Sequence, residues 1–262
     1  MRPDKLTDPV VFEGSTFLIL SLQERLHRHK YWPHGARYDA ESGEYVRTKS
    51  CYRLVRGGLG GVATIGREIK EVIVHHTGGS IVPVGPAGPM SVSAYCVTDP
   101  KPSKYVHDGK PDQRYGRSWP GICYHAWIPY APETVEVLGQ DDDLHPILVS
   151  KHIIYECWTS GWWIYNTAGR NAHCYGIGLQ GSFSHRPGGE PGDPREPSVL
   201  QMELLATWWE EWAKPTLRLE DRDLYGHADY GKPTCPGITA YSWLRSVREM
   251  QADPPVELPP ES

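Results

Sequence analysis

The segment EVIVHHTGG, residues 71–79, constrains the fold of this chain more than any other part of the sequence. An apolar, β-branched run ends there in His75 and His76, directly before two glycines. Such a run is typical of a strand buried on both faces, as in parallel sheets that helices cover. Functional side chains of α/β folds gather where the strands end, so the segment predicts an imidazole at the functional edge of a sheet.

A second segment, YGHADYGKPTCPG, places His227 and Cys235 eight residues apart across a loop rich in Gly and Pro. Zinc binds imidazole and thiolate readily, and a catalytic zinc keeps three protein ligands and one open position for water. The best candidates for the third ligand are His75 and His76. Either segment alone would more often be structural, because most single histidines and buried cysteines are.

A third segment, RSWPGICYHAWIP, alternates aromatic and apolar residues and predicts that Tyr124 lies on a strand near the middle of the sheet. Taken together, the three segments resemble the zinc-dependent N-acetylmuramoyl-L-alanine amidases of type 2, which include phage amidase-type lysozymes and animal peptidoglycan recognition proteins. Four matching pieces follow the family's order between Val72 and Trp243, namely IVHHTGG, SWPGICYHAWI, GRNAHCYGIGLQG and YGHADYGKPTCPG.

The resemblance implies a role for each matching residue. It implies that His75, His227 and Cys235 are the zinc ligands. Neighbouring residues of a strand point to opposite faces, so His76 should not share this role. Tyr124 corresponds to a family residue that helps to position water or to stabilise the oxyanion.

The loop before the cysteine departs from the family's pattern. Many members carry a Lys or Thr two residues before the cysteine, where it helps to stabilise the transition state, and this chain has Pro233 there. Lys232 and Thr234 flank that position, and either could reach the oxyanion after a small shift of the loop. The resemblance also implies that Asp229 fixes this loop or supports a ligand rather than binding the metal.

Two further departures concern the segment around the strand YGIGL. Gly178 stands where some bacterial members carry a Glu, and Tyr165 and Asn166 replace a Trp-His pair that often precedes this strand. We expect Asn166 and Trp162 to contact the substrate, since WTSGWW offers a flat aromatic surface to a sugar or a stem peptide. Packing in the core is the alternative for each of these tryptophans.

The residue types at this site favour hydrolysis of an amide. A zinc ion lowers the pKa of a bound water toward about 7 and polarises the carbonyl under attack. A phenol or ammonium aimed at the tetrahedral oxyanion contributes about 3 kcal/mol. The leaving amine needs a proton, from Tyr124 or from a relayed water. The substrate follows from the resemblance alone, which implies the amide between the lactyl group of N-acetylmuramic acid and L-alanine in bacterial peptidoglycan.

Other classes of protein fit the sequence less well. It lacks the H-E-x-x-H segment that is typical of zincins. It also lacks the H-x-E and P-C-x-x-C segments that are typical of nucleobase deaminases. A cysteine protease with Cys235 or Cys174 as nucleophile stays open, although no cysteine-nucleophile signature is present. A module that binds peptidoglycan without turnover also stays open. Relatives of that kind commonly lack the metal-binding cysteine, which this chain keeps.

Composition bears on partners and location. The net charge of −5 gives no support for nucleic-acid binding, and the FLIL run is too short to span a membrane. Of the six cysteines, the five besides Cys235 form an odd set without paired spacing, which is typical of a reducing cytoplasm. The N-terminus has no apolar signal core. Since the resemblance implies a cell-wall enzyme, it also implies a phage endolysin that is made in the host cytoplasm and acts on the bacterial cell wall after release. We expect this protein to be a monomer.

The sequence predicts the α/β class, with a single mixed central β-sheet flanked by helices in a zinc amidase domain of residues 71–250. Residues 1–70 are expected to form an N-terminal extension or subdomain. The acidic, Pro-rich residues 251–262 are expected to form a tail or linker.

Two helices can be predicted from periodicity. In residues 10–30, a strand or turn should be followed by a helix that carries Leu18, Leu22 and Leu26 on one side. A second helix should begin at Ser198, where Gln201 completes a capping box. Its apolar residues then recur at helical spacing, so this helix should pack one face on the sheet.

Overall fold

One mixed sheet of eight strands forms the centre of the structure, a computed structural model. The strands follow the order β1-β2-β12-β10-β13-β5-β14, and β11 pairs with β12 beside this path. The structure describes residues 8–28, 36–39, 44–47, 68–79, 81–82, 84–97, 101–102, 106–107, 110–111, 114–115, 122–140, 145–158, 164, 166–183 and 194–250. The strands of the sheet are β1 (Val10–Glu13), β2 (Phe17–Ser21), β5 (Glu71–His76), β10 (Ala126–Ile128), β11 (Thr134–Gln140), β12 (Pro146–Glu156), β13 (Cys174–Leu179) and β14 (Leu224–Gly226).

The sheet is mixed because it contains both parallel and antiparallel pairs of strands. Strands β10, β13, β5 and β14 run parallel to one another, and β2 runs parallel to β12. The pairs β1 with β2, β10 with β12, and β11 with β12 are antiparallel. The predicted fold class is confirmed, and β5 lies within the parallel part of the sheet, between β13 and β14.

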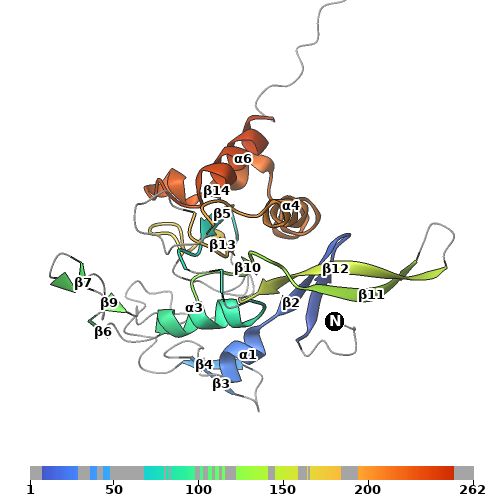
Figure 1. Cartoon of the computed structure of the whole chain (residues 1–262), viewed down its shortest axis with the longest axis horizontal. Coiled ribbons are helices and arrows are strands. Elements are labelled where there is room, and N and C mark those ends of the chain that lie inside the picture. Colours follow the sequence, from blue (N-terminus) through green and yellow to red (C-terminus); the bar gives the residue numbers. More distant parts are fainter. Residues whose placement is uncertain are drawn as a thin grey trace, which may run out of the picture.

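Helices cover both faces of this sheet. Figure 1 shows α4 and α6 on one side and α1 and α3 on the other. The apolar residues of β2 alternate between the two sides: Phe17 and Ile19 pack in the layer under α4 and α6, whereas Leu18 and Leu20 pack in the opposite layer. The helical segments are α1 (Gln23–Arg28), α3 (Ala87–Val97), α4 (Val199–Trp208), η2 (Trp209–Ala213), α5 (Lys214–Leu217), η3 (Asp221–Asp223), η4 (His227–Tyr230) and α6 (Ile238–Glu249).

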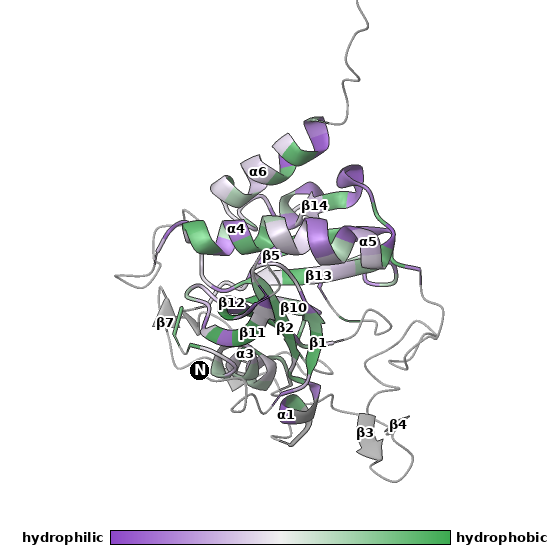
Figure 2. Cartoon of the chain, turned by 90° about the vertical axis from the view of Figure 1, so that its right-hand side faces the viewer, coloured by the Kyte–Doolittle hydropathy of each residue, from purple (hydrophilic) through white to green (hydrophobic). Residues whose placement is uncertain are grey.

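The N-terminal residues contribute to the same sheet. Strand β2 is fully inserted beside β12, and its residues Phe17 to Leu20 are at most 3% exposed. The predicted helix was therefore placed too early: Leu18 belongs to a strand, and the helix begins only at Gln23. Figure 2 shows hydrophobic residues concentrated in β1 and β2 and mixed with hydrophilic ones along α4 and α6.

The predicted start of α4 is confirmed in part. The Ser198 hydroxyl accepts a hydrogen bond from the Gln201 backbone N–H at 3.1 Å, as an N-cap does. The Gln201 side chain does not complete the capping box. It is fully buried, and its Nε2 donates instead to the carbonyls of Ile128 and Gln180, which ties the helix to the ends of β10 and β13.

In the described part of the chain, three short two-stranded sheets lie outside the central one. They pair β3 (Ala36–Asp39) with β4 (Glu44–Arg47), β6 (Lys101–Pro102) with β9 (Arg114–Tyr115), and β7 (Val106–His107) with β8 (Lys110–Pro111).

Among the residues that the structure describes, no helix is long and apolar enough to cross a membrane.

Candidate metal centre

His75, His227 and Cys235 come together at the carboxyl end of β5. The Nδ1 atoms of the two histidines lie 3.0 Å apart, and the Cys235 Sγ lies 4.0 Å from the His75 Nδ1. The three potential ligand atoms all lie within 4.8 Å of one another. His75 and Cys235 are buried, and His227 is partly buried. The three predicted ligands thus form one cluster.

The cluster fits a zinc ion. Zinc bonds of about 2.0–2.1 Å to nitrogen and about 2.3 Å to sulfur, at tetrahedral angles, separate two nitrogens by about 3.4 Å and a nitrogen from a sulfur by about 3.6 Å. The observed 3.0 and 4.0 Å lie close to these values. Two imidazoles and one thiolate are also the donor types that zinc prefers, and three protein ligands are the number found at catalytic sites.

The register of two parallel strands brings the histidines together. Gly226, the last residue of β14, pairs with Val74 of β5, so the residue that follows each of them is a predicted ligand. A Cβ on Gly226 would lie 2.8 Å from the Tyr241 ring and 3.0 Å from Pro236, so a larger residue would push against the loop that carries Cys235. The chain then turns back through η4 and Gly231, whose φ of 84° suits glycine.

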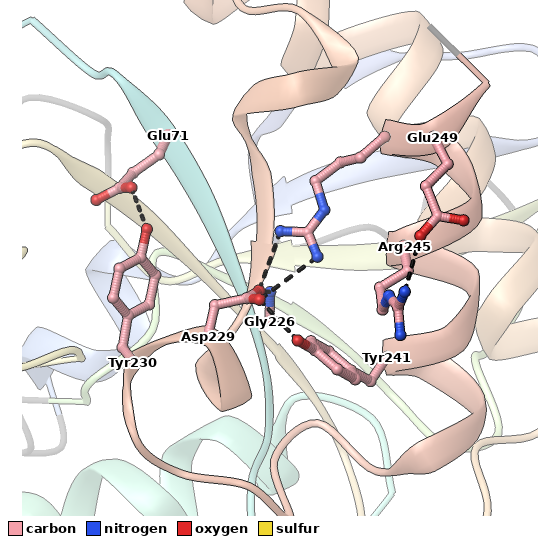
Figure 3. A network of polar contacts seen from close by, with 8 residues as sticks. Glu71, Gly226, Asp229, Tyr230, Tyr241, Arg245 and Glu249 are labelled. Atoms are coloured by element: carbon pink, nitrogen blue, oxygen red, sulfur yellow. Dashed lines mark hydrogen bonds and ion pairs between the residues drawn. The ribbon is translucent and has the colours of Figure 1, made fainter. Parts of the chain in front are cut away.

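Polar contacts on both sides hold η4 in place (Figure 3). The Asp229 carboxylate accepts hydrogen bonds from the Gly226 backbone N–H at 2.9 Å and from the Tyr241 hydroxyl at 2.7 Å, and it pairs with Arg248 at 3.2 Å. The Tyr230 hydroxyl donates to Glu71, at the start of β5, over 2.5 Å. Asp229 therefore secures the turn that begins with His227, through the neighbouring backbone and α6.

Protein groups also contact the other two ligands. The His76 backbone N–H donates to the Cys235 Sγ at 3.3 Å, which favours the thiolate form. The Thr167 hydroxyl lies 3.4 Å from the Nε2 of His75, on the side of the ring away from the cluster. The His76 side chain points elsewhere: its Nδ1 accepts a hydrogen bond from the Phe183 backbone N–H at 3.0 Å, in the layer beneath α4 and α6.

Tyr124 lies beside the cluster, on the same side of the sheet as His75. The prediction that it lies on a strand is wrong, because β10 begins two residues later, at Ala126. The two rings have centroids 5.5 Å apart, and the phenol donates to the His76 carbonyl at 3.4 Å. Burial raises the pKa of Tyr124 well above its ordinary value, so the phenol keeps its proton at neutral pH. Gly178 makes room for it, because a Cβ there would lie 2.9 Å from the Tyr124 ring. The Tyr124 ring could not take this position if residue 178 were the Glu that some bacterial members of the group carry.

Burial keeps both histidine ligands neutral. It lowers the pKa of His75 well below 6.5, with a further contribution from His227. It lowers the pKa of His227 to about 4, assisted by the positive charge of Lys232. The pKa of the Cys235 thiol is raised to about 12 by burial, so without a metal the sulfur is protonated at neutral pH. Metal binding at this site therefore releases the thiol proton.

We expect the metal-free protein to lose stability as the pH falls from 6.5 toward 4. Burial sets the pKa of His76 and of His227 to about 4, whereas unfolded histidine titrates near 6.5. The unfolded state therefore binds more protons in this interval. The stability that depends on neutral histidines is complete above pH 6.5 and is lost as the pH approaches 4. Urea unfolding of chelator-treated protein at pH 7 and pH 5 measures the difference.

A His76→Asn variant is the matched control for this pH dependence. The asparagine Oδ1 takes the place of the His76 Nδ1 and can still accept the hydrogen bond from Phe183, but it does not titrate, so the loss of stability between pH 7 and pH 5 should be smaller. Comparing the two proteins also cancels the contribution of Glu156, whose pKa burial raises. A wild-type unfolding midpoint that does not change with pH would contradict the neutral state of these histidines.

The remaining predicted site residues differ in their exposure and in their contacts. Lys232 is exposed, and its charge acts on both His227 and Cys235. Thr234 is partly buried and directly precedes Cys235. The Asn166 Oδ1 accepts a hydrogen bond from the Cys174 thiol at 2.9 Å, and its Nδ2 is buried without a hydrogen-bond partner among the described residues. Trp162 lies outside the described residues.

The cysteine-nucleophile alternative gains no support from the geometry. Cys174 is fully buried and donates its thiol proton to Asn166. The Cys235 Sγ lies 4.0 Å from the His75 Nδ1, and that nitrogen lies closer to the His227 Nδ1, at 3.0 Å, so it is not placed to take the thiol proton. Thr167 is a residue of the site that the motifs did not indicate, since a hydroxyl within a turn carries no signal of its own.

Comparisons with known proteins complete the description of the site. No protein-family model matches the sequence, and no curated protein matches it. The structure is similar to the endolysin and N-acetylmuramoyl-L-alanine amidase LysCS of Clostridium intestinale, with 16% identity over 71% of this chain and 86% of that chain, and a TM-score of 0.42.

Two other solved structures are similar over a larger share of the chain. The endolysin of Thermus scotoductus bacteriophage Ph2119 has 15% identity over 88% of this chain and 98% of that chain, with a TM-score of 0.42. The Drosophila peptidoglycan recognition protein PGRP-LB has 15% identity over 87% and 92%, with a TM-score of 0.45. Because the scores and identities are low, the function of this chain has to follow from its own residues.

Proposed function

We propose that this protein is a zinc-dependent N-acetylmuramoyl-L-alanine amidase, which hydrolyses the amide between N-acetylmuramic acid and L-alanine in peptidoglycan. The observation that carries the proposal is the cluster of His75, His227 and Cys235, whose ligand atoms lie within 4.8 Å of one another. A protonated phenol, Tyr124, stands next to this cluster. When such a ligand set holds zinc beside a phenol, it supports hydrolysis of a carbonyl compound.

The chain's own residues supply the other parts of the reaction. When bound, zinc provides Lewis acidity and an activated water. His75 and His227 stay neutral and therefore remain ligands at neutral pH. Tyr124, which keeps its proton, can donate a hydrogen bond to the oxyanion that forms on the substrate carbonyl. Lys232 is an exposed cation whose charge acts on this site, which suits it to the same oxyanion after the loop moves.

The proposed substrate and biological setting rest on the motifs rather than on the chemistry of the metal site. The four ordered motifs support peptidoglycan as the substrate, since zinc chemistry alone would permit any accessible amide. The group that the motifs resemble includes phage enzymes, and within it we propose a phage endolysin that is made in the host cytoplasm and acts at the cell wall after release. Asn166 and Trp162 remain the proposed contacts to the glycan or the stem peptide.

Product analysis tests the proposal. Purified peptidoglycan is digested with the zinc-loaded protein, and the soluble products are identified by mass spectrometry. The amidase should release intact stem peptides with a new L-alanine amino group and leave the glycan strands whole. If the protein binds zinc and peptidoglycan but releases no stem peptides, it is a recognition module. Cleavage within the stem peptide would show a different amide specificity.

A further inference from the structure

We infer that Thr167 is a positioning residue for the metal: its hydroxyl holds His75 in the tautomer and orientation that point the Nδ1 lone pair at the ion. The inference rests on the proposed metal site and concerns a residue that belongs to none of the predicted ligands or catalytic groups. Its basis is the contact of 3.4 Å between the Thr167 Oγ1 and the His75 Nε2, on the far side of the ring from the cluster.

The tautomer of His75 decides whether the ring can bind a metal through Nδ1. A neutral imidazole carries its one proton on either Nδ1 or Nε2, and only an unprotonated nitrogen can be a ligand. The His75 Nδ1 faces His227 at 3.0 Å and Cys235 at 4.0 Å, so the proton has to be on Nε2 for the cluster to bind zinc. The Thr167 hydroxyl lies 3.4 Å from Nε2, and in the tautomer that binds the metal its oxygen accepts the hydrogen bond from Nε2–H.

Burial makes a protein acceptor necessary at this position. His75 and Thr167 are each only 2% exposed, so bulk water does not reach the Nε2–H group. A buried N–H group that lacks a partner costs about 1–3 kcal/mol. His227 differs, because it is only partly buried and solvent can contact its ring. The metal site should therefore depend on a protein hydrogen bond at His75 and not at His227.

The turn that carries Thr167 is fixed from several sides. The Asn171 side-chain oxygen accepts hydrogen bonds from the backbone N–H groups of Asn166, at 3.0 Å, and of Thr167, at 2.8 Å. The Arg170 N–H donates to the Thr167 carbonyl at 3.0 Å, and Gly169 supplies the left-handed conformation of this turn with a φ of 79°.

The turn is also connected to the strand that carries the ligand. The Arg170 side chain pairs with Glu71, at the start of β5, over 3.8 Å, and its guanidinium lies 4.9 Å from the centre of the Tyr230 ring. Glu71 accepts the hydrogen bond from Tyr230, which belongs to the η4 turn that begins with His227. The turn of residues 166–173 is thereby linked to both histidine ligands, and Thr167 is the member that reaches a ligand ring directly.

A Thr167→Val variant tests the inference, because it removes the hydroxyl and keeps the shape of the side chain. Thr167→Ser is the matched control, since it keeps the hydroxyl and loses only a methyl group. Zinc affinity is measured by competition with a chromophoric chelator. We expect Thr167→Val to bind zinc about 10- to 100-fold more weakly than wild type, which is the usual effect of removing such a partner, and Thr167→Ser to lie near wild type.

Two further measurements separate positioning from folding. Nitrogen chemical shifts of the histidine rings in the metal-free protein report the tautomer, and the share of His75 protonated on Nε2 should fall in Thr167→Val. Urea unfolding of the metal-free variants shows whether each is folded under the conditions of the assay. Folded Thr167→Val with wild-type zinc affinity and an unchanged His75 tautomer would overturn the inference. If the wild type itself binds no zinc, the proposed metal site fails instead.

Discussion

Cys235→Ala is expected to lose bound zinc and to lower the rate of peptidoglycan hydrolysis by about 10³-fold or more. The substitution removes the only sulfur in the cluster and leaves two imidazoles, of which one is partly exposed. Two neutral ligands hold zinc far less tightly than two imidazoles with a thiolate, and loss of the ion removes several kcal/mol of stabilisation from the transition state. Zinc per protein is measured by atomic emission, and turnover by release of stem peptides.

Cys157→Ala is the control for this experiment. Cys157 is also fully buried, and it packs in the core layer that contains Tyr124 without being one of the three clustered ligands. Its replacement should cost some stability and keep both zinc and turnover. Wild-type zinc content and turnover in Cys235→Ala would rule out the metal site. If the wild type is active without zinc and Cys235→Ala is inactive, the cysteine acts as a nucleophile.

The three clustered residues could be predicted from the sequence, whereas the strand register that brings them together could not. Each ligand lies in a short segment with a recognisable local pattern, such as the buried run before His75 or the Gly/Pro loop between His227 and Cys235. The pairing of Gly226 with Val74, which sets the two histidines side by side, is a long-range register. No local period in the sequence encodes such a pairing, because register depends on how whole strands fit together.

The errors in the fold have a similar cause. The run FLIL is apolar at every position, because β2 is buried on both faces, and such a run cannot be told from a helix segment by periodicity. Leu18 was therefore assigned to the wrong element. Gln201 follows the local capping rule only in part, since its side chain finds better acceptors in the ends of two strands. In both cases tertiary contacts decided between local alternatives.

Tyr124→Phe is expected to lower the turnover number about 10²- to 10³-fold while zinc content stays at the wild-type level. The variant removes one hydrogen-bond donor from the place where negative charge develops, and single donors of this kind contribute about 3–4 kcal/mol to the transition state. The partners of the phenol in the resting protein are the His76 carbonyl at 3.4 Å and the Cys123 thiol, both weak, so it can turn toward the substrate at little cost. Because the interaction forms mainly in the transition state, the KM should change little.

Tyr155→Phe is the matched control for the loss of this phenol. Tyr155 lies in the same core layer as Tyr124, but its hydroxyl donates to Glu133 at 2.9 Å. Removing that hydroxyl should lower stability and leave the turnover number near wild type. Equal turnover in wild type and Tyr124→Phe would exclude the phenol as an oxyanion donor. Lys232, whose charge already acts on His227 and Cys235, and Thr234 would then be the predicted groups left to stabilise the oxyanion from the loop.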